Sequence, residues 1–480
     1  MAKTAEKKSN ELVGYLPQDV PPFGALVSLG LQQFLTMFPA TVLVAVITHF
    51  DISVTLTASG IGTIVALLVS GRRIPMYYGS SFSYIAVIFT VMNQFAGDCM
   101  SQQGMICYEG IRVVQVGIIG TAVVEILIGL LIMAVGKEAL DKVLPPVITG
   151  SIAIVIGIAL AGTALAEASY NWPVAFITLF ATIAFSVYLQ GKGLIGMLPI
   201  LLGAIVGWAV AAIFWPEIVN MSYFQAAKWF AVPHFTLPNF AAPGVWGYAI
   251  SIALIAIATV PESTAHLYQM SLYIDQLAIE VGKKPVEIKK LIGLNLIADG
   301  SDDLVVGFLG GCAGTNYGEN NSLMAITRNY SVAVLMAAGV IAILLGFVGK
   351  LAGAVQSLPT PVVGGLSIYL FGVIGMQGVA LIQSEKVNLF DPRQLAVGAT
   401  ILVLGIGGQF YKYIKAADAG LDTPVNTIGY GVYDISIPGI FPNGIPNIIF
   451  AALVGILLNA VFLLIKPSWF GVKERINVAE

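Results

Sequence analysis

The stretch GGCAGTNYGENN, residues 310–321, constrains the fold because it puts polar residues between two apolar segments. Residues 304–309 before it and residues 323–326 after it are apolar, so Glu319 is expected at membrane depth. Backbone groups left unpaired in hydrocarbon are costly, and a broken segment survives there only against protein or a water-filled cavity. The stretch therefore predicts an interrupted membrane span inside a bundle of other spans.

The whole chain has the composition of a polytopic membrane protein. Of its 480 residues, 57% are hydrophobic and 10% are charged, which is too little charge to cover a soluble surface. A span needs about 20 mostly apolar residues. With three shorter or interrupted segments included, the sequence predicts an all-α fold with about 14 spans, near 24–48, 54–70, 77–94, 115–135, 146–165, 173–189, 194–214, 246–262, 288–299, 303–326, 331–349, 360–382, 394–409 and 446–465.

The basic residues indicate the orientation of these spans. If the N-terminus is cytoplasmic and the spans alternate, most of the 23 Lys and Arg residues fall on the cytoplasmic side. The exceptions are Arg112, Lys228, Lys350, Lys412 and Lys415. This bias favours an even number of spans, with cytoplasmic tails at residues 1–20 and 467–480.

A second interrupted segment, MYYGSSFSYIAV at residues 76–87, matches the first in character. Each mixes Gly with Ser, Thr, Asn or Tyr, and the two occupy corresponding positions in the two halves of the chain. Broken segments at matching places in two halves mark the substrate site of many transporters, and they predict two inverted repeats of seven spans. Two glycine-rich packing spans would give the same pattern without a site.

Two carboxylates are the main candidates for function. Glu262 ends the apolar run SIALIAIATVPE, and His266 follows four residues later, on the same face if the helix continues past Pro261. Ionisable residues inside a membrane are costly and are functional candidates by default. If Glu262 and Glu319 share one low-dielectric cavity, at least one can exchange a proton near neutral pH. Such a set suits a planar heterocycle with adjacent N–H and C=O groups. The alternatives are a span end at the interface for Glu262 and a structural hydrogen bond for Glu319.

Other polar residues receive simpler interpretations. Glu125 is expected to bond between helices, whereas Asp299, Asp302 and Asp303 are expected in a solvent-exposed turn between the ninth and tenth spans. Cys99 and Cys107 share a polar loop, where a disulfide and two free thiols are both possible. Cys312, Cys99 and Cys107 are too few for a disulfide framework, and the three histidines have no metal-ligand spacing. We therefore predict no metal and no cofactor.

The chain resembles the nucleobase–ascorbate transporter family, and within it the bacterial uracil permeases. The family signature is matched by ENNSLMAITR, residues 319–328, except that Ser322 replaces a Gly. Tyr317-Gly318-Glu319-Asn320 matches the Tyr-Gly-Glu-Asn run of the uracil-type members, whereas purine-type members usually carry Gln at the position of Glu319. Further matches are QQFLTMFPATVL at 32–43, YGSSFSYI at 78–85 and Glu262 with His266. The likeness extends from about residue 20 to residue 466.

The resemblance implies an architecture. It has 14 spans in two inverted seven-span repeats, with short β-strands in spans 3 and 10. A core domain would comprise spans 1–4 and 8–11, at residues 21–142 and 241–357, and a gate domain spans 5–7 and 12–14, at 143–240 and 358–466. The resemblance also implies a homodimer in the inner (cytoplasmic) membrane.

The resemblance further implies which residues bind the substrate. Glu262 and Glu319 would hydrogen-bond the base, backbone around Phe82 and Gly318 would bind its polar edge, and Tyr317 and Ser81 would line the pocket. His266 would orient Glu262 for proton coupling, and Gln33 would belong to the same proton-coupling group. Gln33 replaces the usual His of the first span and cannot titrate, and Ser322 adds a side chain next to the site.

These residues predict a secondary transporter that imports uracil or a related pyrimidine by proton symport through alternating access. Its partners would be a small nucleobase, a proton and the lipid bilayer, without nucleic acid. A xanthine or urate permease is the main alternative. An anion transporter of the same fold would favour a basic residue near the strands, and residues 76–87 and 310–321 contain none. A membrane enzyme would need a nucleophile motif or metal cluster, which the sequence does not offer.

Overall fold

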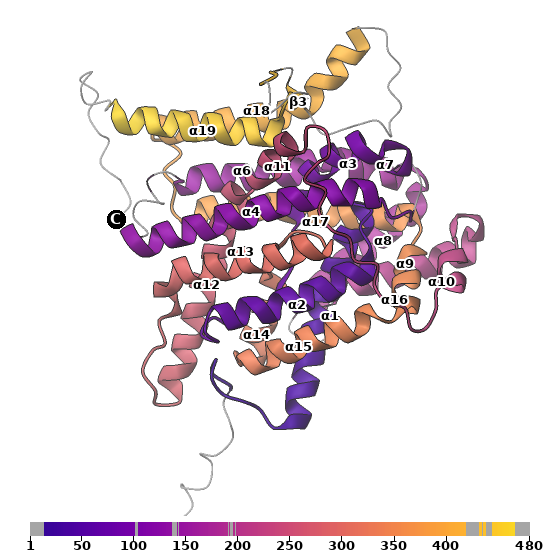
Figure 1. Ribbon diagram of the computed structural model, residues 1–480, viewed down its shortest axis with the longest axis horizontal. Coiled ribbons are helices and arrows are strands. Elements are labelled where there is room, and N and C mark those ends of the chain that lie inside the picture. The colour runs from indigo at the N-terminus through magenta and orange to yellow at the C-terminus, as the bar shows by residue number, and fades with distance from the viewer. Residues whose placement is uncertain are drawn as a thin grey trace, which may run out of the picture.

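The computed structural model describes residues 14–100, 104–136, 142, 144–190, 192, 195–196, 198–418, 432–433, 435–437 and 444–465. The predicted cytoplasmic tails fall largely outside these residues, at 1–13 and 466–480. Helices account for most of the described chain (Figure 1). The first half contains α1 (Phe23–Ile47), α2 (Ile52–Val69), η1 (Phe82–Tyr84), α3 (Ile85–Met100), α4 (Tyr108–Val135), α6 (Pro146–Ala159), α7 (Ala161–Ser169), α8 (Trp172–Tyr188), α9 (Pro199–Phe214), η3 (Pro216–Ile218) and α10 (Ser222–Ala226).

The second half of the described chain is also mainly helical. It contains α11 (Val245–Ala253), α12 (Ala256–Glu280), η4 (Ile288–Leu291), α13 (Ile292–Leu309), α14 (Gly318–Thr327), α15 (Val332–Gly346), α16 (Gly349–Gln356), α17 (Thr360–Ser384), α18 (Pro392–Asp418) and α19 (Asn447–Leu464). In the described part of the chain, four short strands interrupt the helices: β1 (Tyr78–Ser80), β2 (Gly314–Asn316), β3 (Val432–Tyr433) and β4 (Ile445–Pro446).

Local sequence explains several helix boundaries. Asp51 caps α2 by accepting a hydrogen bond from the Val54 N–H at 3.1 Å. α13 ends at Gly310, whose φ of +90° is a left-handed conformation that glycine adopts without steric cost. α12 continues through Pro261, as the spacing of Glu262 and His266 requires if they are to share a face.

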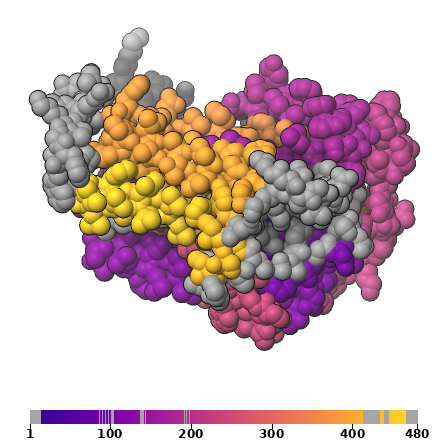
Figure 2. All heavy atoms as spheres, turned by 90° about the horizontal axis from the view of Figure 1, so that it is seen from above, coloured from indigo at the N-terminus to yellow at the C-terminus, as the bar shows by residue number. Residues whose placement is uncertain are grey.

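The described helices fall into two sets by their packing. α13 packs on α4 and α2, α15 on α1 and α2, and α11 on α4. In the other set, α17 packs on α6, α7 and α8, and α18 packs on α19 and α6. Figure 1 shows α18 and α19 at one side of the molecule and α14 and α15 at the other, and in Figure 2 the orange and yellow C-terminal helices lie together on the viewed face.

The helices are long and apolar enough for a multi-pass membrane protein. Eight described helical segments qualify by length and composition, and α8, α9 and α15 are shorter apolar helices. Large apolar side chains point outward along several of them, such as Leu131 on α4, Phe180 on α8 and Leu457 on α19. Exposed Leu and Phe at this density fit a lipid-facing surface.

The expectation for Asp299, Asp302 and Asp303 is wrong. These residues do not form an exposed turn; they lie inside the continuous helix α13 with exposed fractions of 1%, 0% and 0%. The three closely spaced Asp residues predicted a turn, because Asp is unfavourable both inside helices and inside a membrane. The chain instead breaks after Gly310, where glycine permits the sharp reversal into β2. The interrupted segment is therefore β2 followed by α14.

The loop cysteines form a disulfide. Cys99, in the last turn of α3, is bonded to Cys107, which precedes α4, with Cα atoms 5.8 Å apart. Cys312 is a free buried thiol beside the hydroxyl groups of Thr48 and Thr55. The backbone N–H of Cys107 donates to the His49 carbonyl, so the closed loop is attached to the turn between α1 and α2. Of the two possibilities for Cys99 and Cys107, the structure has the bonded pair.

Candidate functional site

The two interrupted segments meet as a short antiparallel ladder. Tyr78 pairs with Asn316, Gly79 with Thr315 and Ser80 with Gly314. The backbone N–H of Tyr317 donates to Tyr77 O at 2.9 Å, and that of Ser81 donates to Ala313 O at 2.8 Å, so the pairing extends beyond the strands. Strands β1 and β2 thus satisfy each other's backbone groups in a place where no solvent would do so.

Neighbouring helices hold the ladder through hydroxyl groups. Ser59 and Thr63 of α2 both donate to the Tyr78 carbonyl, at 2.7 and 2.9 Å. Tyr317 donates to the Ser80 carbonyl at 2.7 Å and lies 3.0 Å from the Thr41 hydroxyl of α1. The Tyr317 ring is 4% exposed, because it packs on Gly79, where a Cβ atom would come within 2.7 Å of the ring. Its hydroxyl is therefore engaged with the protein.

Glu262 and His266 project from α12 towards β2 and α14. The Nδ1 atom of His266 lies 3.0 Å from the Asn316 carbonyl and 2.7 Å from the Asn316 side-chain oxygen. A Cβ atom on Gly318 would lie 3.0 Å from the Nε2 atom of His266, so the ring rests against the start of α14. Glu262 interacts electrostatically with both His266 and Glu319 and with the Ser83 side chain. Four predicted residues are thereby brought together.

Glu319 lies in the first turn of α14. The N-cap residue Tyr317 makes no side-chain capping bond, so the first N–H groups of this helix have no side-chain acceptor from their cap. Glu319 is exposed, and Gly318, Glu262, His266 and Phe82 are partly exposed. The site therefore presents two carboxylates, an imidazole and a helix N-terminus.

Gln33, on α1, contacts the first turn of α14. Asn320 donates from its amide nitrogen to the Gln33 carbonyl at 2.9 Å and to the Gln33 side-chain oxygen at 2.8 Å. Gln33 is 1% exposed, so it joins α1 to α14 from within the protein. The substitution Ser322 folds back onto its own helix, donating to the Gly318 carbonyl at 2.9 Å.

Ser81 and Phe82 start the helix that follows β1. The Ser81 side chain accepts from the Ser83 N–H at 3.3 Å and caps η1, and Ser81 is buried whereas Phe82 is partly exposed. Each strand is followed directly by a helix start, at opposite ends of the ladder. Both helix N-termini thus lie beside the two strands, which is an arrangement that favours electron-rich groups of a ligand.

Asn316 belongs to this site although it was not among the predicted site residues. Its side-chain oxygen lies 2.7 Å from the His266 ring nitrogen, and its amide donates to the Ser263 hydroxyl at 2.7 Å, so it joins β2 to α12. The sequence signalled it only as one polar residue within the run 310–321. Its importance comes from the ladder register, which no sequence pattern in this chain predicts.

Comparisons with known proteins agree with this architecture. A family model described as "Permease family" matches residues 24–414. The uracil permease of Bacillus caldolyticus is 36% identical over 406 residues, covering 82% of this chain and 88% of that protein. The uracil permease of Bacillus subtilis (strain 168) is 33% identical over 476 residues, covering 96% and 98%. That of Escherichia coli (strain K12) is 33% identical over 399 residues, covering 81% and 86%.

Solved structures share the fold at low sequence identity. The transmembrane domain of the cyanobacterial bicarbonate transporter BicA gives a TM-score of 0.56 at 14% identity, covering 80% of this chain and 95% of that one. The structure of SLC26A9 gives 0.61 at 13% identity, covering 94% and 66%. At this identity the likeness concerns the fold alone. The family model and the permease relatives establish more: the chain belongs to the nucleobase–ascorbate transporter family and is a multi-pass membrane transporter, not an enzyme.

Proposed function

We propose that this protein imports uracil, or a closely related pyrimidine base, by proton symport. The observation that carries the proposal is the grouping of Glu262, His266 and Glu319 beside the start of α14. The relatives described above are uracil permeases, which supports the same substrate class. Uracil has ring N–H groups that donate to carboxylates and carbonyl oxygens that accept from helix N-terminal N–H groups.

In this proposal, Glu262 and Glu319 accept hydrogen bonds from the N–H groups of the base. Backbone N–H groups at Gly318 and near Phe82 donate to its carbonyl oxygens. Ser81, directly after β1, and Tyr317, directly after β2, line the site, and His266 holds the orientation of Glu262. Gln33 acts indirectly, because it fixes Asn320 on the same helix as Glu319.

Proton coupling follows from the cost of moving a buried charge. When Glu262 takes up a proton, its carboxyl group loses its charge and can donate as well as accept. The loaded core domain, in which Glu262 is uncharged, then moves past the gate domain at lower cost than the empty core domain, in which Glu262 is charged. Transport thus proceeds by alternating access of a core domain at residues 21–142 and 241–357 against a gate domain at 143–240 and 358–466.

The proposed architecture has 14 spans in two inverted repeats of seven. It is supported by the ladder of β1 and β2, since each strand precedes a helix in the third span of its half. Both termini are cytoplasmic in this topology, in the inner membrane. The disulfide between Cys99 and Cys107 supports this orientation, because it then lies on the outer, oxidising side.

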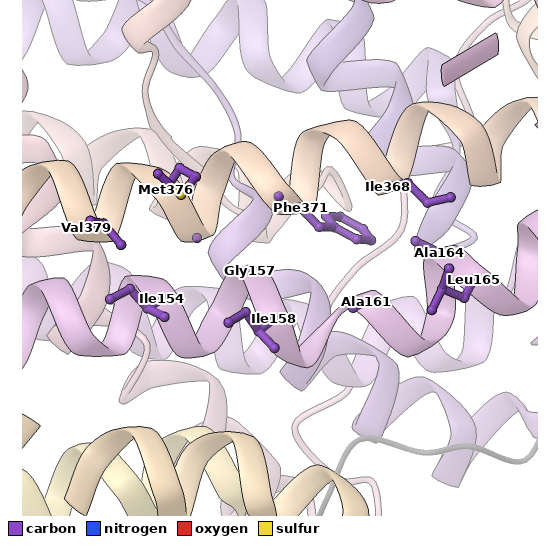
Figure 3. A pocket seen from close by; sticks show the side chains of 12 residues that line it. Ile154, Gly157, Ile158, Ala161, Ala164, Leu165, Ile368, Phe371, Met376 and Val379 are labelled. Atoms are coloured by element: carbon purple, nitrogen blue, oxygen red, sulfur yellow. The ribbon is translucent and has the colours of Figure 1, made fainter. Parts of the chain in front are cut away.

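We further propose a homodimer formed through an apolar groove between α6, α7 and α17. Ile154, Ile158, Phe371 and Met376 line it, and Gly372 borders it with no other atom within 4 Å of the position that a Cβ atom would take. Figure 3 shows these side chains along α6 and α17, and a Cβ atom on Gly157 of α6 would lie 2.4 Å from the Gly375 backbone of α17. Small residues at such a seam favour close helix packing in membranes.

The test is uptake of labelled uracil into proteoliposomes, with and without an inward proton gradient. Unlabelled uracil and xanthine serve as competitors. We expect uptake that the gradient stimulates and that uracil blocks but xanthine does not. Absence of uracil uptake, or equal block by xanthine, would contradict the proposed substrate.

A further inference from the structure

Behind the strand ladder lies a second group of carboxylates, on α13 and α4. Asp299, Asp302 and Asp303 occupy one helix, α13, and Glu125 faces them from α4, which packs closely on α13. Their exposed fractions are 1%, 0%, 0% and 1%, respectively. Four acids are therefore enclosed within the bundle at membrane depth.

Asp303 has the surroundings of an ionised carboxylate. One of its oxygens accepts from the Gly314 N–H at 2.6 Å, at the start of β2. The other accepts from the Tyr84 hydroxyl at 3.1 Å, in the turn that leads into α3. Both oxygens thus have donors, and the residue ties the two interrupted segments together.

Asp302, the adjacent residue, has none of these donors. Its carboxyl group fits between two glycines: a Cβ atom on Gly62 would lie 2.0 Å from one oxygen, and a Cβ atom on Gly314 would lie 2.1 Å from the other. Within the described part of the chain, neither oxygen of Asp302 accepts a hydrogen bond, whereas the Ser263 hydroxyl of α12 faces Asp299. Glu125 accepts from Thr259 at 2.6 Å with one oxygen, and its other oxygen has no described partner.

The groups facing the cluster include no cation. Tyr78 of β1 is 0% exposed, its hydroxyl has no described partner, and it interacts electrostatically with Glu125, Asp299 and Asp302. Tyr77 and Tyr84 face Asp302 and Asp303, and Glu262 of α12 faces Asp299. The sequences of α2, α3, α12, α13, β1 and β2 contain no Lys or Arg. Arg112, on α4, binds the Leu237 carbonyl.

Such a cluster needs a neutralising ligand. An unpaired buried charge costs several kcal/mol even after relaxation, and like charges add to that cost. Either bound protons or a bound cation could remove it. Among the described residues, no group of three or more His, Cys, Asp or Glu is arranged to hold a metal ion. The geometry therefore favours protons.

We propose that Asp302, Asp299 and Glu125 form a second proton-binding site, occupied at neutral pH, and that Asp303 beside them stays ionised. The unpartnered Tyr78 hydroxyl, enclosed with these acids, belongs to the same site. The bound protons let the core domain carry these acids through the bilayer without their charge. The proposal does not depend on which base is transported or on the role of Glu262.

Infrared difference spectroscopy of the purified protein at neutral pH tests this directly, because a protonated carboxyl group and a carboxylate absorb at different frequencies. The variant is Asp302→Asn, since an amide has the shape of a protonated acid. We expect the spectrum of the wild type to contain the carbonyl band of a protonated carboxyl group that the spectrum of D302N lacks. Glu385→Gln, at an exposed carboxylate after α17, is the matched control and should show lost carboxylate bands. If D302N does not fold, Asp299→Asn and Glu125→Gln give the same readout.

The neighbouring pair supplies a second readout. D302N should melt within about 2 °C of the wild type, whereas Asp303→Asn should melt clearly lower, because an amide cannot accept at both of its ends. Lost carboxylate bands in D302N would overturn the proposal. Replacing choline chloride with sodium chloride gives a further test. If the band of the protonated acid then disappears and the melting temperature rises, the ligand is a cation and the proposal is overturned.

Discussion

Asn316 shows how much one side chain decides in this site. Its backbone pairs with Tyr78 in the ladder, its amide donates to Ser263, and its oxygen lies 2.7 Å from the His266 ring. It therefore holds α12, which carries Glu262, at a fixed distance from the strands. His266 was predicted to orient Glu262, and Asn316 is the group that in turn orients His266.

Glu319→Gln tests the proposed contact with the base. The amide presents a donor where the ring N–H of uracil also donates, so we expect affinity to fall by about tenfold or more, equivalent to about 1.4 kcal/mol. Calorimetric titration with uracil measures this, with Glu385→Gln as the control for loss of an exposed carboxylate. An unchanged affinity would leave Glu319 with a structural role only.

Asp51 predicts a pH dependence of stability outside the spans. Burial raises the pKa of this carboxyl above its ordinary value of 3.8, although bonds from Val54 and Tyr108 oppose the rise. A raised folded-state pKa gives stability that is complete below the unfolded pKa and is lost as pH rises through the folded pKa. Asp51→Asn keeps the cap without ionising.

We therefore expect D51N to gain stability relative to the wild type as pH rises from about 4 to 7. Thermal unfolding in detergent across that range measures the difference between the two melting temperatures. A constant difference would show that the ionisation of Asp51 is not linked to folding.

The sequence identified candidate residues by their chemical type, but the segments that surround each residue determine its burial and its contacts. Glu262, His266, Gly318 and Glu319 meet as predicted from their motifs. Asp302 and Asp303 were misplaced because a local pattern cannot show that Gly62, Gly314 and Tyr84 approach them from other segments. The predicted bond between helices at Glu125 is present, through Thr259.

At the scale of elements, the decisive feature is the ladder of β1 and β2. Each strand has only three residues, so side chains from α1, α2 and α13 supply much of its support. Interruption by Gly and polar residues was evident in the sequence. The ends of α13 and α14 were not evident in the sequence. The Asp residues within α13 were predicted to form a turn, and Gly310 was predicted to lie inside a span.

Gly79→Ala should disrupt this ladder. The added Cβ atom would lie 2.7 Å from the Tyr317 ring and 3.0 Å from the Thr41 hydroxyl, which overpacks the strand by about 1–3 kcal/mol. We expect a lower melting temperature and reduced uracil uptake. Gly24→Ala, on α1 with nothing within 4 Å of its Cβ position, is the control and should melt at or above the wild-type temperature. Normal stability and uptake in G79A would mean that the ladder tolerates displacement of Tyr317.

At the scale of the molecule, the helices of residues 143–240 and 358–466 contact those of residues 21–142 and 241–357 mainly through α10 with α16, and less through α12 with α6 and α1 with α9. Weak contact between well-packed units suits relative motion. The composition predicted a membrane bundle, but the spans predicted at 288–299 and 303–326 are wrong in their bounds, because α13 runs continuously from Ile292 to Leu309. The pairing of helices into two sets could not be inferred from those runs, because each span is apolar on most of its surface.

Gly372→Trp tests the proposed dimer. The new ring would occupy the groove beside Phe371, where α17 offers open space, and should convert the dimer to a monomer. Light scattering with size-exclusion chromatography in detergent measures the mass. Leu457→Trp, on the exposed face of α19, is the matched control. A dimeric G372W would place the interface elsewhere.

Glu262→Gln gives the most direct test of the central claim, that Glu262 couples the proton to the base. In proteoliposomes, we expect this variant to exchange labelled for unlabelled uracil without a gradient, because the amide resembles the protonated carboxyl group. It should fail to accumulate uracil when an inward proton gradient is imposed. Gradient-driven accumulation equal to that of the wild type would contradict the account.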